Sequence, residues 1–143
     1  MPFRFREDIA TADVAFEAWG ETREELFVSS AAALLRTMVD DPGEVALRQE
    51  LTLRMEHEEL DLLLFSFLQE LVFLKDARQL LLHAATMRID EREGIFHLEA
   101  VVRGEEIAPL RHRLLVDVKA VTLHRFQVVF GDNAWRATVV LDV

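Results

Sequence analysis

The stretch that decides the fold is residues 58–75, EELDLLLFSFLQELVFLK. Leucine, valine and phenylalanine side chains cover most of the circumference of a helix built from it, and a single strand of this length is implausible. A helix that is apolar nearly all round must be enclosed by other elements of the chain. We therefore expect a helix over 58–75 at the centre of the core, with the rest of the chain packed around it.

The residues before this stretch predict a strand, a helix and a second strand. Residues 12–19, ADVAFEAW, alternate between apolar and other side chains, which is typical of a half-buried strand. Thr22 and Glu25 then have the spacing of a capping box, and the helix that it opens should end near Val39. Residues 45–56 again alternate with a period of two and predict the most regular strand of the protein.

The residues after the central helix predict two antiparallel hairpins. Strands over 79–90 and 95–102 are joined by a short turn containing glycine, and strands over 114–130 and 134–142 by a second one. Two helices and a series of hairpin-linked strands indicate an α+β fold of two layers, a mainly antiparallel β-sheet with two helices packed on it. A length of 143 residues is typical of one domain, so we assign 1–143 to a single domain.

The composition excludes several classes of function. The chain has no cysteine, which excludes disulfides, thiolate zinc sites and a cysteine nucleophile. Its formal net charge of -10 would repel nucleic acid, so we expect no autonomous binding to RNA or DNA and favour a cation or a basic protein as partner. We expect neither a signal peptide nor a membrane-spanning segment, which predicts a cytoplasmic protein.

Residues 118–124, VKAVTLH, place polar side chains inside an apolar run. A regular strand would turn Thr122 and His124 toward the core and Lys119 away from it. His124 would then be a buried histidine that donates to a carbonyl group, and Lys119 a solvated surface residue. A bulge of one residue near Ala120–Val121 would instead bring Lys119 and His124 to the same side of the strand.

The C-terminus, VVLDV, sets the carboxylate of Asp142 beside the terminal carboxylate of Val143. Two neighbouring anions repel each other unless a cation stands nearby, and a third carboxylate from Asp13 would complete a pocket of hard oxygen ligands suited to calcium or magnesium. The alternative is that Asp142 is a frayed terminal residue in water and Asp13 an exposed residue at the start of a strand. The sequence contains no His-Glu-x-x-His motif, phosphate loop, nucleophile elbow or EF-hand loop.

Four blocks of the sequence together resemble the archease family. They are TADVAFEAWG at 11–20, LLLFSFLQELVFLKD at 62–76, VKAVTLH at 118–124 and VVLDV at 139–143, and in this order they cover essentially the whole chain. The resemblance implies a small α+β protein that is not itself an enzyme. It implies an activator of the GTP-dependent RNA-splicing ligase, which joins a 3'-phosphate or 2',3'-cyclic-phosphate end to a 5'-hydroxyl in tRNA splicing or RNA repair. The activator would promote guanylylation of the ligase and multiple turnover.

The resemblance also implies site residues. Asp13, Asp142 and Val143 correspond to the family's ligands for a divalent metal, with calcium as the expected ion. Lys119 and His124 fall in the family's Val-Lys-Ala-x-Thr-x-His block, where they would either contact the ligase or support the fold.

The chain departs from the family pattern at two places. Many archeases have Asp-His-Thr-Ala-Asp where this chain has IATAD at 9–13, so that Ala10 replaces the histidine and the acid before it is also missing. Any contact that this imidazole makes with a metal or with the ligase in other archeases would therefore be missing from this chain. Leu123 stands where a tyrosine is common.

Two other functions remain open. One is a stand-alone metal-dependent hydrolase, in which His124 acts as general base toward a metal-bound water. The other is a general protein chaperone or scaffold, which the small size and the acidity suggest. We prefer the ligase activator over the hydrolase, because a calcium-like ion lowers the pKa of bound water only weakly and the chain offers few other catalytic groups.

Overall fold

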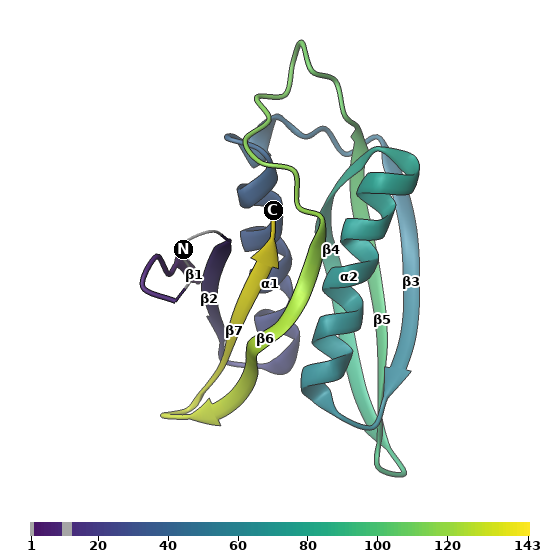
Figure 1. The fold of residues 1–143 in the computed structure, drawn as a ribbon. Helices are drawn as coiled ribbons and strands as arrows, with labels where there is room; N and C mark the ends of the chain where they lie inside the picture. Colours follow the sequence, from purple (N-terminus) through teal and green to yellow (C-terminus); the bar gives the residue numbers. More distant parts are fainter. Residues whose placement is uncertain (1, 10–12) are drawn as a thin grey trace.

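The computed structural model describes residues 2–9 and 13–143. Figure 1 shows the chain with its two helices lying against antiparallel strands. The elements in chain order are β1 (Phe3–Phe5), β2 (Val14–Gly20), α1 (Arg23–Met38), a 3-10 turn (Pro42–Glu44), β3 (Gln49–His57), α2 (Leu60–Arg78), β4 (Leu80–Arg92), β5 (Ile95–Glu106), β6 (Ala120–Gly131) and β7 (Ala134–Asp142).

The strands of the described ranges form two sheets and not one. One has four strands in the order β1-β2-β7-β6, the other three in the order β3-β5-β4, and neighbouring strands are antiparallel. Helix α1 packs against β2 of the first sheet and β4 of the second, and α2 packs against β6 and all three strands of the second sheet. The two helices therefore join the two sheets around a common core, and the predicted α+β class is confirmed.

Helix α2 is the central helix that residues 58–75 predict. Its side chains at Leu63, Leu64, Phe67 and Leu68 are fully buried, and the ring of Phe67 stacks on that of Phe27 from α1 with 6.1 Å between ring centroids. Burial of large apolar side chains from both helices contributes about 1.5–3 kcal/mol for each. The contact between the helices therefore contributes strongly to the stability of the core.

The capping box predicted for α1 is confirmed. The amide of Glu25 donates to the hydroxyl oxygen of Thr22 at 3.0 Å, and the Glu25 carboxylate accepts from the amide of Glu21 at 2.7 Å. Both bonds satisfy amides that a helix N-terminus leaves without partners.

Several predicted strand bounds differ from the structure. The strand expected over 114–130 begins only at Ala120, and residues 107–119 form a long connection that Figure 1 shows extending beyond the ends of both helices. Its backbone forms isolated contacts instead of a continuous ladder with one strand. The amide of Leu115 donates to the carbonyl of Met38 at 2.9 Å, and Leu114 forms an isolated bridge with Val39. A bond to β7 forms only at the end of the connection, from the amide of Lys119. The strand expected from residue 45 begins at Gln49, after the 3-10 turn.

The two hairpin turns carry residues with positive φ, as tight hairpins require. Glu93 and Gly94 join β4 to β5, and Asp132 and Asn133 join β6 to β7. The short strand β1, which pairs with β2, was not predicted. In the part of the chain that the structure describes, neither helix is long and apolar enough to cross a membrane.

Candidate functional site

The VKAVTLH and VVLDV stretches lie side by side at one end of the four-stranded sheet. Strand β6 pairs with β7 through Ala120 and Asp142, Val121 and Leu141, and Thr122 and Val140. The amide of Lys119 donates to the carbonyl of Asp142 at 2.8 Å. Figure 1 shows the C-terminus at the start of β6, as this register requires.

Asp13 approaches the same end of β7 from its other side. Val14 of β2 pairs with Leu141 of β7, so Asp13 and Asp142 are the next residues outward from this pair. Both side chains are exposed, and Val143 is half-buried. The start of β2, the start of β6 and the end of the chain thus lie at the same end of the sheet. Residues 10–12 of the family motif, which include Ala10, lie outside the described residues.

Strand β6 has a bulge, as one of the two alternatives supposed, but the bulge lies further along the strand than Ala120–Val121. Thr122 pairs with Val140 and Gln127 with Thr138, so residues 123–126 stand opposite the single residue 139. Arg125 within the bulge has a φ of 55°. Bulges of this kind turn side chains out of the regular alternation.

The bulge changes the environment of the polar residues in VKAVTLH. His124 is exposed, so the regular-strand alternative, in which it is a buried histidine, is wrong, while Lys119 is exposed as expected of a solvated surface residue. Thr122 is half-buried, and its hydroxyl donates to the carbonyl of Val140 at 3.0 Å. Lys119 and Asp142 are therefore exposed groups at the chain end, and His124 is exposed further along β6, in the bulge.

Helix α2 supports this end of the sheet with two polar side chains. The side-chain oxygen of Gln69 accepts from the amide of Val121 at 2.9 Å. The ammonium of Lys75 donates to Asp117 Oδ1 at 2.5 Å and to the carbonyl of Val118 at 2.7 Å. Burial alone would lower the pKa of Lys75, but its bonds to Asp117 and Asp76 outweigh that effect and raise the pKa above its usual value.

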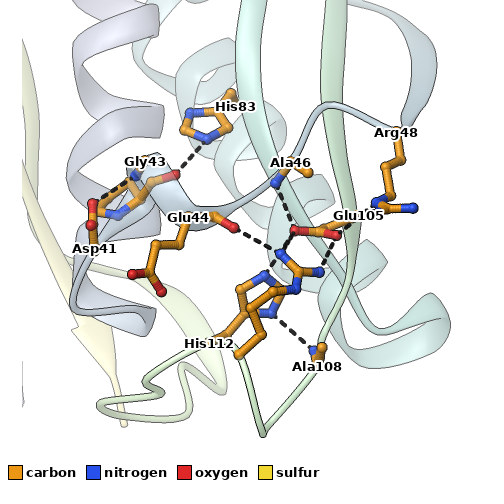
Figure 2. Close-up of polar contacts among 11 residues, drawn as sticks. Asp41, Gly43, Glu44, Ala46, Arg48, His83, Glu105, Ala108 and His112 are labelled. Carbon is orange, nitrogen blue, oxygen red and sulfur yellow. Dashed lines mark hydrogen bonds and ion pairs between the residues drawn. The ribbon is translucent and has the colours of Figure 1, made fainter.

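A second polar cluster holds the connection that leads to this site. Figure 2 shows the buried carboxylate of Glu105, which accepts from the amide of Ala46 at 2.6 Å, from His112 Nε2 at 2.9 Å and from the guanidinium of Arg111. Nδ1 of His112 accepts from the amide of Ala108 at 2.9 Å, which places the ring proton on Nε2. The cluster therefore ties residues 108–112 to the end of β5 and to the segment before β3.

Electrostatics keep Glu105 ionised. The bonds from Arg111, then from the amide of Ala46 and from His112, hold the pKa of the Glu105 carboxyl well below its usual value of 4.5, against the opposing effect of burial. This cluster was not predicted, because no local pattern of the sequence indicates that Glu105 and His112 are buried together.

The predicted ligand set is compatible with a hard divalent cation. Within 2–9 and 13–143, no group of three His, Asp or Glu side chains lies close enough to hold a metal ion, so a site here needs oxygens other than side chains. The terminal carboxylate of Val143 supplies such oxygens beside Asp142. Calcium prefers carboxylate and main-chain oxygens, which is the donor set that Asp13, Asp142 and Val143 offer.

Comparison with known proteins relates the whole chain to one family. The model of the archease protein family matches residues 3–143. Protein archease of Pyrococcus furiosus is 32% identical over 134 residues, 93% of this chain and 94% of that protein, and protein archease of Archaeoglobus fulgidus is 31% identical over the full length of both.

Solved structures have the same fold. The solution structure of protein 1598 of Methanobacterium thermoautotrophicum superposes with a TM-score of 0.87 at 33% identity and covers 99% of both chains. The crystal structure of a Thermotoga maritima archease, described as a possible chaperone, superposes with a TM-score of 0.65 at 20% identity and covers 96% of both chains, which shows the shared fold alone. From the family match and these relatives together, we conclude that the chain belongs to the archease family.

Proposed function

We propose that this archease is a non-catalytic activator of the GTP-dependent RNA-splicing ligase. It promotes guanylylation of the ligase and multiple turnover in tRNA splicing or RNA repair, and it acts in the cytoplasm. The observation that carries the proposal is the match to the archease family over residues 3–143. The net charge of -10 supports an action through a protein partner, because an acidic chain is repelled by RNA but attracted to the basic surface of an RNA-binding enzyme.

The end of the sheet formed by β2, β7 and β6 is the proposed working site. Asp13, Asp142 and the terminal carboxylate of Val143 would hold a divalent cation, for which calcium is the first candidate. The cation would neutralise the crowded carboxylates and leave a positive centre for an anionic group of the partner complex. Lys119 at this end and His124 in the bulge of β6 are both exposed, so a docked ligase could reach them.

The direct test is ligation of an RNA with a 3'-phosphate end at limiting ligase, with and without this protein. We expect several turnovers per ligase molecule in its presence and about one in its absence. Product per ligase that does not change on addition of the protein would sink the proposal.

A matched pair of variants tests the site. Asp142→Asn should abolish both calcium binding and ligase activation. Asp132→Asn removes the same charge at the other end of β7, in the exposed turn with positive φ that asparagine accepts, and should leave both intact. If the two variants activated the ligase equally well, ligase activation would not depend on the proposed ligand Asp142.

The same preparations discriminate the other functions. Cleavage of phosphodiesters by the protein alone, lost in Asp142→Asn, would indicate a hydrolase. Suppression of the aggregation of unrelated proteins would indicate a general chaperone; the Thermotoga maritima protein is described as a possible chaperone.

A further inference from the structure

Lys75 is a buried lysine on the last turn of α2 whose contacts reach outside its own helix. The residue is 4% exposed. Its ammonium donates to Asp117 Oδ1 at 2.5 Å and to the carbonyl of Val118 at 2.7 Å, and it pairs with Asp76 Oδ1 at 2.6 Å. All three donors of the ammonium therefore have partners.

Stability alone does not account for a lysine at this position. Burial of an ammonium carries a desolvation cost, and apolar side chains of similar volume often replace buried ion pairs without loss of stability. An apolar side chain, however, cannot donate hydrogen bonds to particular atoms of another segment. Two of the three partners of Lys75 lie in such a segment, at Asp117 and Val118.

The segment that Lys75 holds has no regular structure of its own. Residues 115–119 belong to neither helix nor strand, and within them only Val118 is buried. Their position therefore depends on individual contacts, of which the Lys75 ammonium supplies two and the amide of Leu115 a third, through the carbonyl of Met38.

One peptide group connects Lys75 to the chain end. The carbonyl of Val118, which accepts from Lys75, belongs to the same peptide group as the amide of Lys119, which donates to the carbonyl of Asp142. A charged donor on one side of a planar peptide group orients and polarises the amide on its other side. Lys75 thus acts on the main chain of Asp142 through a single peptide unit.

We propose that Lys75 is a positioning residue of the C-terminal site. Its ammonium fixes the peptide group between Val118 and Lys119, which fixes the main chain of Asp142, and the carboxylates of Asp142 and Val143 are thereby directed to one point. The inference rests on the proposed role of these two residues as metal ligands.

The test combines two measurements on Lys75→Met, which keeps the volume of the side chain and removes its bonds. Titration with calcium alone should show an affinity about tenfold weaker than that of the wild type, as is usual when a group that orients a metal ligand is lost. Hydrogen exchange of the Lys119 amide, followed by NMR without metal, should become at least about tenfold faster, because the Val118 carbonyl is no longer held.

Two further variants provide a matched comparison. Asp117→Asn and Asp76→Asn each remove one carboxylate partner of Lys75 and one negative charge, but only Asp117 lies in the segment that leads to the site. Asp117→Asn should weaken calcium binding and speed exchange of the Lys119 amide, whereas Asp76→Asn should change neither. This pair also decides the matter if Lys75→Met fails to fold.

The outcomes separate this inference from the proposed function. An unchanged calcium affinity in Lys75→Met, an unchanged exchange rate of the Lys119 amide, or equal effects of Asp117→Asn and Asp76→Asn would each overturn the positioning role. Absence of calcium binding in the wild type would overturn the proposed metal site instead. The exchange rates would then still decide whether Lys75 positions the main chain of Asp142.

Discussion

Gly104 in β5 lies where the structure leaves no room for a side chain, and Gly104→Ala is expected to destabilise the protein strongly. A Cβ atom built on Gly104 would lie far inside contact distance of the Leu81 carbonyl oxygen, 2.8 Å from the Leu81 carbonyl carbon and 3.0 Å from Leu82 Cα. These atoms belong to the backbone of β4, which pairs with β5 here, so the two strands must move apart.

The expected loss in the free energy of unfolding follows from the contacts and ladder bonds that this movement weakens. Overpacking typically costs about 1–3 kcal/mol, and weakening one or two ladder bonds adds about 1 kcal/mol for each. We therefore expect a loss of about 3–4 kcal/mol, against a total stability of about 5–15 kcal/mol for a domain. For a chain of this length, the melting temperature should fall by about 10 °C.

Gly131→Ala is the matched control. No atom lies within 4 Å of a Cβ built on Gly131, so the substitution should change the free energy of unfolding by less than about 0.5 kcal/mol. Urea unfolding followed by circular dichroism measures both variants. Similar midpoints for Gly104→Ala and the wild type would refute the reasoning from backbone approach.

Three further predictions concern acid stability, the metal and the core. The pKa of Glu105 is lower in the folded protein than its ordinary value of 4.5, so its ionised carboxylate stabilises the protein above that pH. Stability should therefore fall as the pH drops below about 4.5, and acid denaturation curves should show a weaker fall for Glu105→Gln. Calcium at 100 times its dissociation constant should raise the free energy of unfolding by about 2.7 kcal/mol in the wild type and not in Asp142→Asn, as thermal melts would show. Phe67→Ala, which removes the ring stacked on Phe27, should cost about 3–5 kcal/mol in urea unfolding, and a loss below 1 kcal/mol would contradict its burial.

The parts of the fold that depend on local pattern were predictable from the sequence. The apolar circumference of 58–75 predicted α2 because a helix of that composition must be enclosed. Thr22 and Glu25 predicted the start of α1 because the capping box is completed within a few residues. The turn residues between β6 and β7 likewise have the positive φ that their sequence favours.

The division into two sheets was not predictable in the same way. Alternation of side chains identifies a strand but does not name its neighbour, and β7 pairs with the distant β2 as well as with β6. Residues 114–119 alternate as a strand does, yet they form none, since their bonds go to three separate partners, Met38, Lys75 and Asp142. The conformation of such a segment is determined by its tertiary contacts and not by its local sequence pattern.

The residues of the candidate site came from the family resemblance and stay a prediction, whereas their geometry came from the structure. Resemblance to the family assigned Asp13, Asp142 and Val143, and the register pairs Val14 with Leu141, the residues next to Asp13 and Asp142 in the chain. The bulge at 123–126 could not be placed from the sequence, because a bulge depends on where two strands lose their common register. The regular-strand alternative, with His124 buried, therefore does not hold.

The position of β7 argues against the alternative that Asp142 is a frayed terminal residue. Chain ends fray when their backbone has few partners. Here the last strand lies inside its sheet, with Val14 opposite Leu141 on one side and Ala120 opposite Asp142 on the other. The amide of Lys119 adds a bond to the carbonyl of Asp142. The backbone of Asp142, held in this way, has lost much of its conformational freedom before any ligand arrives, so a ligand bound through this residue would be spared that part of the entropic cost.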